Sequence, residues 1–345
     1  MFHRSLLRTS SFAIAGLGGY QVYKTNYVDC APATTKDFTK LRTNDFNLSH
    51  HHHGKAKVRV LKVRHSSKGS NEKHSVSEYT VKTRLYSPEY EKVFTKDNNQ
   101  GLVATDTQKN TIYVVAKRTE AETPEQFGID IAEHFLSNYP ILTAVQIELE
   151  ETLWERSKID GVEHNHAFTK VSPERNCAKI RLCRGDNTPE VTSSIQDMTI
   201  LKTTQSGFED YLLKDQDQYT LLNETEDRCL STVLAAEWSY NARHVDYAKA
   251  RSALRTELIR GLFGPADTGV FSVSLQATIY DAGCLALQKL PELEKINITT
   301  PNVHYLPTSK LLSDLKVVKA GEEVRDVFQP TCEPSGMIFC EVSRK

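Results

Sequence analysis

The chain has 345 residues, of which 39% are hydrophobic and 25% charged, and its formal net charge is −1. This is the composition of a globular protein with a large core, and the length favours two domains. The near-neutral charge gives no electrostatic argument for binding nucleic acid or a membrane surface, so we expect neither partner. Seven scattered cysteines without CxxC spacing predict free thiols, not a disulfide framework or a zinc site.

The first 53 residues differ in composition from the rest, and we interpret them as a presequence-like segment followed by a linker. Residues 1–28 carry Arg4, Arg8 and Lys24, several serines and no acidic residue. This composition is typical of a mitochondrial presequence, and a disordered tail is the alternative. The polar residues after Val28 end in four histidines, 50–53. We expect this run to be a flexible surface segment, because adjacent side chains on an extended chain point to opposite sides and suit one metal poorly.

Two alternating segments open the folded part. Residues 57–60 and 77–86 predict paired strands, with turn-forming residues 66–71 between them. Residues 101–118 come next, where Thr105 and Asp106 favour a turn or a helix start. The apolar run that begins at Asn110 fits a strand or a helix, and taken locally we interpret it as a strand entered from a Thr-Asp turn.

The remaining pattern repeats one order of elements. A helix is predicted to begin at Thr123, followed by Pro124 and an acidic first turn, and to end before Pro140. Further strands are predicted at 145–150, 176–184, 195–203, 230–240, 270–280, from 304 and at 336–342, and further helices at 245–263 and 281–290. Strands, helices and strands occur twice, which predicts an α+β class with domains at 54–190 and 191–345.

His164 and His166 are the one pair with metal-ligand spacing. Residues i and i+2 of a strand share a face, so both side chains can reach one ion. No third ligand is apparent nearby, and polar stabilisation of a turn after Asp160-Gly161 explains the pair equally well. The sequence has no phosphate loop, no GxGxxG and no HExxH, which gives no support for a dinucleotide enzyme or a zinc protease.

Five stretches between Gly54 and about Val342 together resemble the urate oxidase (uricase) family, in that family's order. They are His53-Gly54-Lys55 leading into VRVLKV, VATDTQKNTIYV at 103–114, DGVEHNHAF at 160–168, LKTTQSGF at 201–208 with Asp227-Arg228, and SLQATIY at 274–280 with PNVHY at 301–305.

The resemblance implies oxidation of urate by O2 and water to 5-hydroxyisourate and hydrogen peroxide, without a metal or an organic cofactor. It implies two tandem tunnelling-fold (T-fold) domains, with antiparallel sheets and helices on one face, that assemble into a barrel-like homotetramer with active sites between subunits. It also implies residence in the peroxisome. The chain ends in Ser343-Arg344-Lys345, not the Ser-Lys-Leu address, so the basic N-terminus makes the mitochondrion the alternative.

The resemblance also assigns site residues, with Thr105 and Asp106 arriving from a neighbouring subunit. Two departures from the family's usual pattern are His53 in place of Tyr and Leu275 in place of Val. The catalytic proton relay is implied to be Lys55, Thr105 and His304, and the substrate-binding residues are implied to be Thr105, Asp106, Phe208, Arg228, Leu275, Gln276 and Asn302.

These residue types suit the chemistry of urate, a planar and anionic ring. The Arg228 guanidinium offers a bidentate contact, Gln276 offers a donor and an acceptor together, and the ring of Phe208 fixes the plane. A lysine with a hydroxyl beside it can accept and pass on a proton. A purine- or pterin-binding T-fold protein without oxidase activity is the alternative function.

Overall fold

The computed structural model describes residues 45–65, 73–213, 216–242 and 244–345, and it separates residues 1–48 from a second unit, 49–345. The presequence-like segment up to residue 44 and the predicted turn at 66–71 lie outside the described residues. Every helix among the described residues is too short or too polar to span a bilayer. The six described cysteines are free thiols, as predicted.

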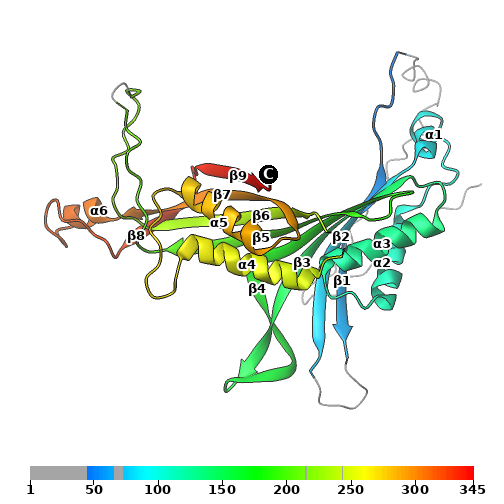
Figure 1. Cartoon of the computed structure of the whole chain (residues 1–345), viewed down its shortest axis with the longest axis horizontal. Coiled ribbons are helices and arrows are strands. Elements are labelled where there is room, and N and C mark those ends of the chain that lie inside the picture. Colours follow the sequence, from blue (N-terminus) through cyan, green and yellow to red (C-terminus); the bar gives the residue numbers. More distant parts are fainter. Residues whose placement is uncertain (1–44, 66–72, 214–215, 243) are drawn as a thin grey trace, which may run out of the picture. The chain divides into compact units, whose positions relative to one another are not determined.

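One antiparallel sheet runs through the unit 49–345 in the order β1 to β8, with β9 paired to β7 (Figure 1). Its first four strands are β1 (His53–Arg64), β2 (Ser75–Tyr86), β3 (Ala144–Ile159) and β4 (Val162–Cys183). The others are β5 (Glu190–Lys202), β6 (Leu230–Tyr240), β7 (Leu293–Pro307), β8 (Phe328–Thr331) and β9 (Met337–Ser343). The predicted strand regions at 57–60, 77–86, 145–150, 176–184, 195–203 and 230–240 are confirmed.

The helices follow the strands in the predicted order. Between β2 and β3 lie the 3-10 turn η2 (Pro88–Tyr90), α1 (Glu91–Thr95), α2 (Thr105–Arg118) and α3 (Pro124–Asn138). Between β6 and β7 lie α4 (Tyr247–Phe263) and α5 (Leu275–Lys289), and α6 (Ser309–Asp314) follows β7. The predicted start of α3 is confirmed, because the Thr123 hydroxyl accepts a hydrogen bond from the Gln126 amide and Pro124 opens the helix.

Two elements differ from the predictions. Residues 105–118 form a helix, so the local interpretation as a strand was wrong. Residues 275–280 belong to α5, so the predicted strand at 270–280 was wrong as well. In both segments the buried positions recur at helical spacing, as at Ile112 and Val115 in α2 and at Leu275 and Ile279 in α5.

Two hydrophobic clusters fill the space between sheet and helices. One joins β1–β4 with α2 and α3, and the other joins β5–β7 and β9 with α4 and α5. α4 and α5 approach closely at Gly261, where a Cβ would lie 2.5 Å from the Cα of Ala282. The sheet stays continuous between β4 and β5, where Arg175 pairs with Gln196. The domain boundary at 190–191 stays a prediction.

The histidine run 50–53 stays at the surface as predicted, with His50 and His52 exposed. The rings of three of its members nevertheless contact neighbouring aromatic side chains, which a free run would not do. His51 lies 3.1 Å from the carbonyl oxygen of Ser87, and the rings of His51, His52 and His53 contact Phe94, Tyr86 and Tyr90.

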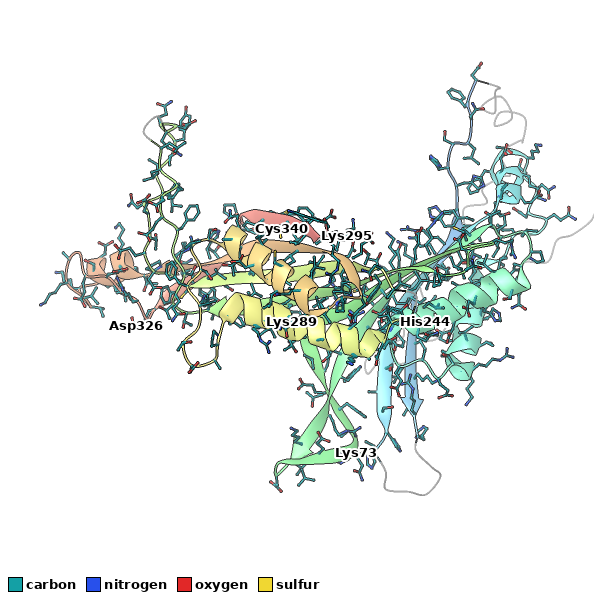
Figure 2. The ribbon with its side chains drawn as sticks, viewed as in Figure 1. Lys73, His244, Lys289, Lys295, Asp326 and Cys340 are labelled. Atoms are coloured by element: carbon teal, nitrogen blue, oxygen red, sulfur yellow. The ribbon has the colours of Figure 1, made fainter. Side chains whose placement is uncertain are left out.

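His164 and His166 lie on β4 near the end of the β1–β2 pair. Their rings are 4.7 Å apart, and the His166 amide donates to Nδ1 of His164 at 3.3 Å. Lys73, labelled in Figure 2, joins the β1–β2 pair to β4 through an ion pair with Glu163 at 2.6 Å. Among the described residues no group of three or more His, Cys, Asp or Glu side chains is placed to hold a metal. The local polar role of the His pair therefore fits the structure better than a metal site.

Candidate active site

Lys55 lies near the start of β1, beside a β-bulge. The pairing of β1 with β2 shifts register between Lys55 and Val58, and Lys57 has a φ of 57°. Gly54 lies so close to β2 that a Cβ there would collide with the carbonyl oxygen of Thr83. The glycine therefore permits the approach of the two backbones that sets the position of Lys55.

Thr105 and Asp106 form the first turn of α2, after Ala104 at the N-cap. Their amides precede the first intrahelical donor, because the bond to the Ala104 carbonyl comes from the amide of Gln108 at 3.0 Å. Hydrogen bonds from Lys109 (2.5 Å) and Asn110 (2.9 Å) lower the pKa of Asp106, and the nearby charge of Lys55 lowers this pKa further. The structure thus places Lys55 with Thr105 and Asp106. We call these three residues the relay group.

Phe208 and Arg228 meet on two segments that precede β6. The Phe208 amide donates to Thr225 at 2.7 Å, and the Arg228 amide donates to the carbonyl of Ser206 at 2.8 Å. The Arg228 guanidinium lies 5.2 Å from the Phe208 ring centroid, and Tyr211 stacks on the same ring at 4.5 Å. Burial of the guanidinium lowers the pKa of Arg228, but an arginine keeps its charge in proteins.

The segment that leads into α5 pairs with the Phe208 segment. Ser206 forms a parallel bridge with Ser272, and the Gly207 amide donates to the Ser272 carbonyl at 2.9 Å. Two residues later Ser274 caps α5, so that Leu275 and Gln276 are its first two residues. Leu275 is buried, whereas Gln276 is exposed on a helix and is not the amide within an apolar strand that the sequence suggested.

Asn302 and His304 lie on β7 and share a face of the sheet. Asn302 pairs with Thr232 on β6, and His304 pairs with Thr331 on β8. In the β6–β7 register Ser231 lies opposite Val303. The start of β6, two residues after Arg228, therefore lies alongside His304. We call this second set of residues the clamp group: Phe208, Arg228, Leu275, Gln276, Asn302 and His304.

The relay group and the clamp group are far apart within one chain. β1 and β7 are separated by six strand spacings, or about 29 Å along the sheet at about 4.8 Å per spacing. α2 and α5 are correspondingly well separated (Figure 1). One surface hollow, of about 490 Å³, is lined by residues within 119–130 and 245–248. A second, of about 350 Å³, is lined by residues within 201–205 and 263–269. Neither lining includes a residue of either group.

Several supporting residues were not predicted from the sequence. Thr83 and Gln108 are buried beside Lys55 and hydrogen-bonded to each other at 2.6 Å. Lys202 donates to the carbonyl of Val270 and, at 3.0 Å, to the hydroxyl of Ser272, next to the clamp group. The sequence signal for Gln108 was available, because a polar residue at helical spacing from Ile112 and Val115 falls on the buried face of α2.

Comparisons with known proteins agree with the resemblance. The uricase family model matches residues 51–181 and 191–339. A uricase of Danio rerio is 36% identical over 303 residues, covering 85% of this chain and 93% of that protein. A uricase of Arabidopsis thaliana is 37% identical over 302 residues, covering 85% and 94%. The crystal structure of uricase from Arthrobacter globiformis superposes with a TM-score of 0.74 at 28% identity, covering 87% of this chain and 96% of that one.

Proposed function

Because the chain belongs to the uricase family, we propose that it oxidises urate with O2 and water to 5-hydroxyisourate and hydrogen peroxide. In this reaction urate gives up two electrons, O2 takes up two electrons and two protons to leave as hydrogen peroxide, and water supplies the added hydroxyl. Urate is its own source of electrons, so the proposal includes no metal and no organic cofactor. The observation that carries the proposal is that the site residues lie in two separate sets on different elements, the clamp group and the relay group.

The clamp group suits a flat anion rich in hydrogen-bonding edges. The Arg228 guanidinium offers two parallel donors to a carbonyl and a ring nitrogen, and Gln276 offers a donor and an acceptor to the opposite edge. The start of a helix favours negative charge, so in the proposal the backbone amide at Leu275, the first residue of α5, donates to a urate carbonyl. The Phe208 ring holds the plane of the purine.

Proton transfer in the proposal uses Lys55 and Thr105 of the relay group and His304 of the clamp group. In the proposal Lys55 accepts a proton from urate through the Thr105 hydroxyl, and His304 passes protons toward the reduced oxygen species. Asn302 faces the position of O2 or water above the ring. Asp106 orients the substrate beside Thr105. General acid–base help of this kind contributes on the order of 10²–10⁴-fold to a rate.

The proposal requires a second copy of the chain. The separation of about 29 Å prevents one chain from closing the relay group onto its own clamp group, so we propose that each site takes the two groups from different subunits. Exposed apolar side chains in the second half of the chain support such an assembly: Leu221 is 86% exposed, Met337 76% and Phe339 61%. The proposed assembly is a homotetramer of paired T-fold domains, and its expected mass is four times the 39.0 kDa of the chain.

The activity is tested by mixing the purified protein with urate and following the loss of its near-ultraviolet absorbance together with O2 uptake and peroxide release. We expect turnover that persists in chelator-treated buffer. Binding of urate with no O2 uptake would support the non-oxidising alternative, and loss of turnover on chelation would contradict the cofactor-free reaction.

The compartment is a separate part of the proposal. The family resemblance implies the peroxisome, and the basic, acid-free residues 1–28 make import into mitochondria the alternative. A fluorescent protein fused behind the first forty residues tests this directly. Mitochondrial fluorescence supports the presequence, and diffuse fluorescence contradicts it.

A further inference from the structure

The Lys55 backbone is hydrogen-bonded to a buried side chain of the neighbouring strand. The Lys55 amide donates to Oγ1 of Thr83 at 3.0 Å. Thr83 is 1% exposed and lies directly across the β1–β2 pair from Lys55. Because paired residues of an antiparallel ladder share a face, Lys55 and Thr83 are both on the face of the sheet that α2 covers.

A second buried side chain continues this bond into α2. The Thr83 hydroxyl donates to Oε1 of Gln108 at 2.6 Å, and Nε2 of Gln108 donates to the carbonyl of Val103 at 3.0 Å. Gln108 is fully buried, at 0% exposure. The hydrogen bonds thus run without a break from Lys55, through Thr83 and Gln108, to the residue two positions before Thr105.

This chain of bonds spans the relay group. Gln108 lies three residues after Thr105, one turn along the same helix, so its amide fixes the first turn of α2 against β1 and β2. The charge of Lys55 lies near enough to Asp106 to lower the pKa of that carboxyl. The bulge between Lys55 and Val58 disrupts the β1–β2 ladder beside Lys55, and the bond from the Lys55 amide to the Thr83 hydroxyl lies at the edge of this disruption.

We infer that Gln108 and Thr83 are positioning residues, which hold the Lys55 backbone in register with Thr105 and Asp106 without contacting the substrate. This inference rests on the proposed roles of Lys55 and Thr105. A hydrogen-bonded amide and hydroxyl in a buried site are directional, so they fix the relay geometry more tightly than apolar packing of the same volume. A displacement of about 1 Å at a reacting group can cost about a hundredfold in rate.

The test is the substitution Gln108→Leu, which keeps the size of the side chain and removes its polar groups. We expect kcat to fall by about ten- to a hundredfold, while KM for urate changes by less than about twofold. KM is largely spared because the clamp group, which supplies most of the proposed contacts to urate, lies on other elements than Thr105 and Asp106. The matched control is Gln146→Leu: Gln146 is 6% exposed and donates to Glu148 at 2.7 Å, on the opposite face of the sheet. It should keep the wild-type kcat.

A second set of variants separates positioning from stability. Thr83→Val should lower kcat relative to the wild type. Thr83→Ser keeps the hydroxyl and should have a kcat close to that of the wild type. The double variant Thr83→Val/Gln108→Leu removes the Thr83 hydroxyl that Gln108→Leu leaves without its acceptor, while the Lys55 amide and the Val103 carbonyl lose their side-chain partners. It should therefore recover only part of the thermal stability lost in Gln108→Leu, while kcat stays low.

Three outcomes would overturn the inference: recovery of kcat together with stability in the double variant, an equal loss of kcat in Gln146→Leu, or a rise of KM that accounts for the whole loss of kcat/KM.

The variant Lys55→Ala distinguishes failure of the positioning inference from failure of the proposed function. If Lys55→Ala turns over urate as the wild type does, the relay assignment itself is wrong. If Lys55→Ala is inactive and Gln108→Leu is fully active, only the positioning inference is wrong.

Discussion

Glu125 on α3 and Arg251 on α4 form an ion pair that joins the two halves of the chain. The Glu125 side chain is 0% exposed and that of Arg251 8%. Arg251 also donates to the carbonyls of Ser194 at 2.6 Å and Cys177 at 3.1 Å, on the two strands where the halves meet. The Ser193 hydroxyl donates to the same Glu125 carboxylate. The pair therefore ties both helices to the centre of the continuous sheet.

Removing the carboxylate by Glu125→Ala leaves the buried guanidinium without its ion-pair partner. Such losses cost about 3–5 kcal/mol of the free energy of unfolding, and we expect a value near the lower end because Arg251 keeps two carbonyl acceptors. The control is Asp314→Ala, which breaks an ion pair with Lys310 whose side chains are 64% and 89% exposed. An exposed pair of this kind contributes at most about 1 kcal/mol.

Urea unfolding at one fixed protomer concentration measures both values, since assembly adds to the apparent stability. Equal losses for Glu125→Ala and Asp314→Ala would refute the reasoning. The double variant Glu125→Leu/Arg251→Met adds a second check, because replacing both charges by apolar side chains should be less destabilising than Glu125→Ala alone.

Two further predictions concern a clamp support and a histidine cluster. Lys202→Met removes the bonds that hold Ser272 ahead of α5, so KM for urate should rise about tenfold with a smaller change in kcat; an unchanged KM would contradict this role. Burial and nearby positive groups lower the pKa of His74, so the folded chain holds that proton more weakly than the unfolded chain. The resulting stability is present above a pH of about 6.5 and is lost as the pH falls through the lowered pKa. His74→Asn should therefore reduce the drop in Tm between about pH 7.5 and about pH 5.5, and an undiminished drop would refute this. The groups around His74 are His65, His166 and Arg156.

The order of elements could be predicted because strands with one buried face alternate in sequence. The helix at 105–118 was harder to predict, since the run Thr111 to Val115 is rich in β-branched residues that favour strands. Packing overrides that preference: Ile112 is fully buried, whereas Tyr113 is 46% and Val114 41% exposed. A strand would bury alternate residues, and this run buries one helical stripe.

The start of α5 was mispredicted for a related reason. Val270 to Tyr280 alternates well enough to suggest a strand, but Ser274 bonds the Ala277 amide and begins a helix in the middle of it. The consequence for the site is large. Gln276 presents its amide from the exposed first turn of a helix, and not from within a sheet.

The identity of the candidate residues came from the resemblance, and their grouping came from the structure. Nothing in the spacing of Lys55, Thr105 and Asp106 shows that a bulge on β1 lies beside the first turn of α2. Long-range pairing decides this, and pairing between residues fifty positions apart is not encoded in local propensity. The bonded link through Thr83 and Gln108 is invisible to sequence analysis for the same reason.

The central claim is that each active site takes its relay group from one chain and its clamp group from another. Lys55→Ala and Arg228→Ala should each be inactive alone while keeping the assembled mass. Co-expressed with different tags and purified through both, the two variants should recover activity, because some sites then combine an intact relay group with an intact clamp group. Random equal mixing predicts about a quarter of wild-type activity. Mixed assemblies that contain both chains and remain inactive would contradict the claim.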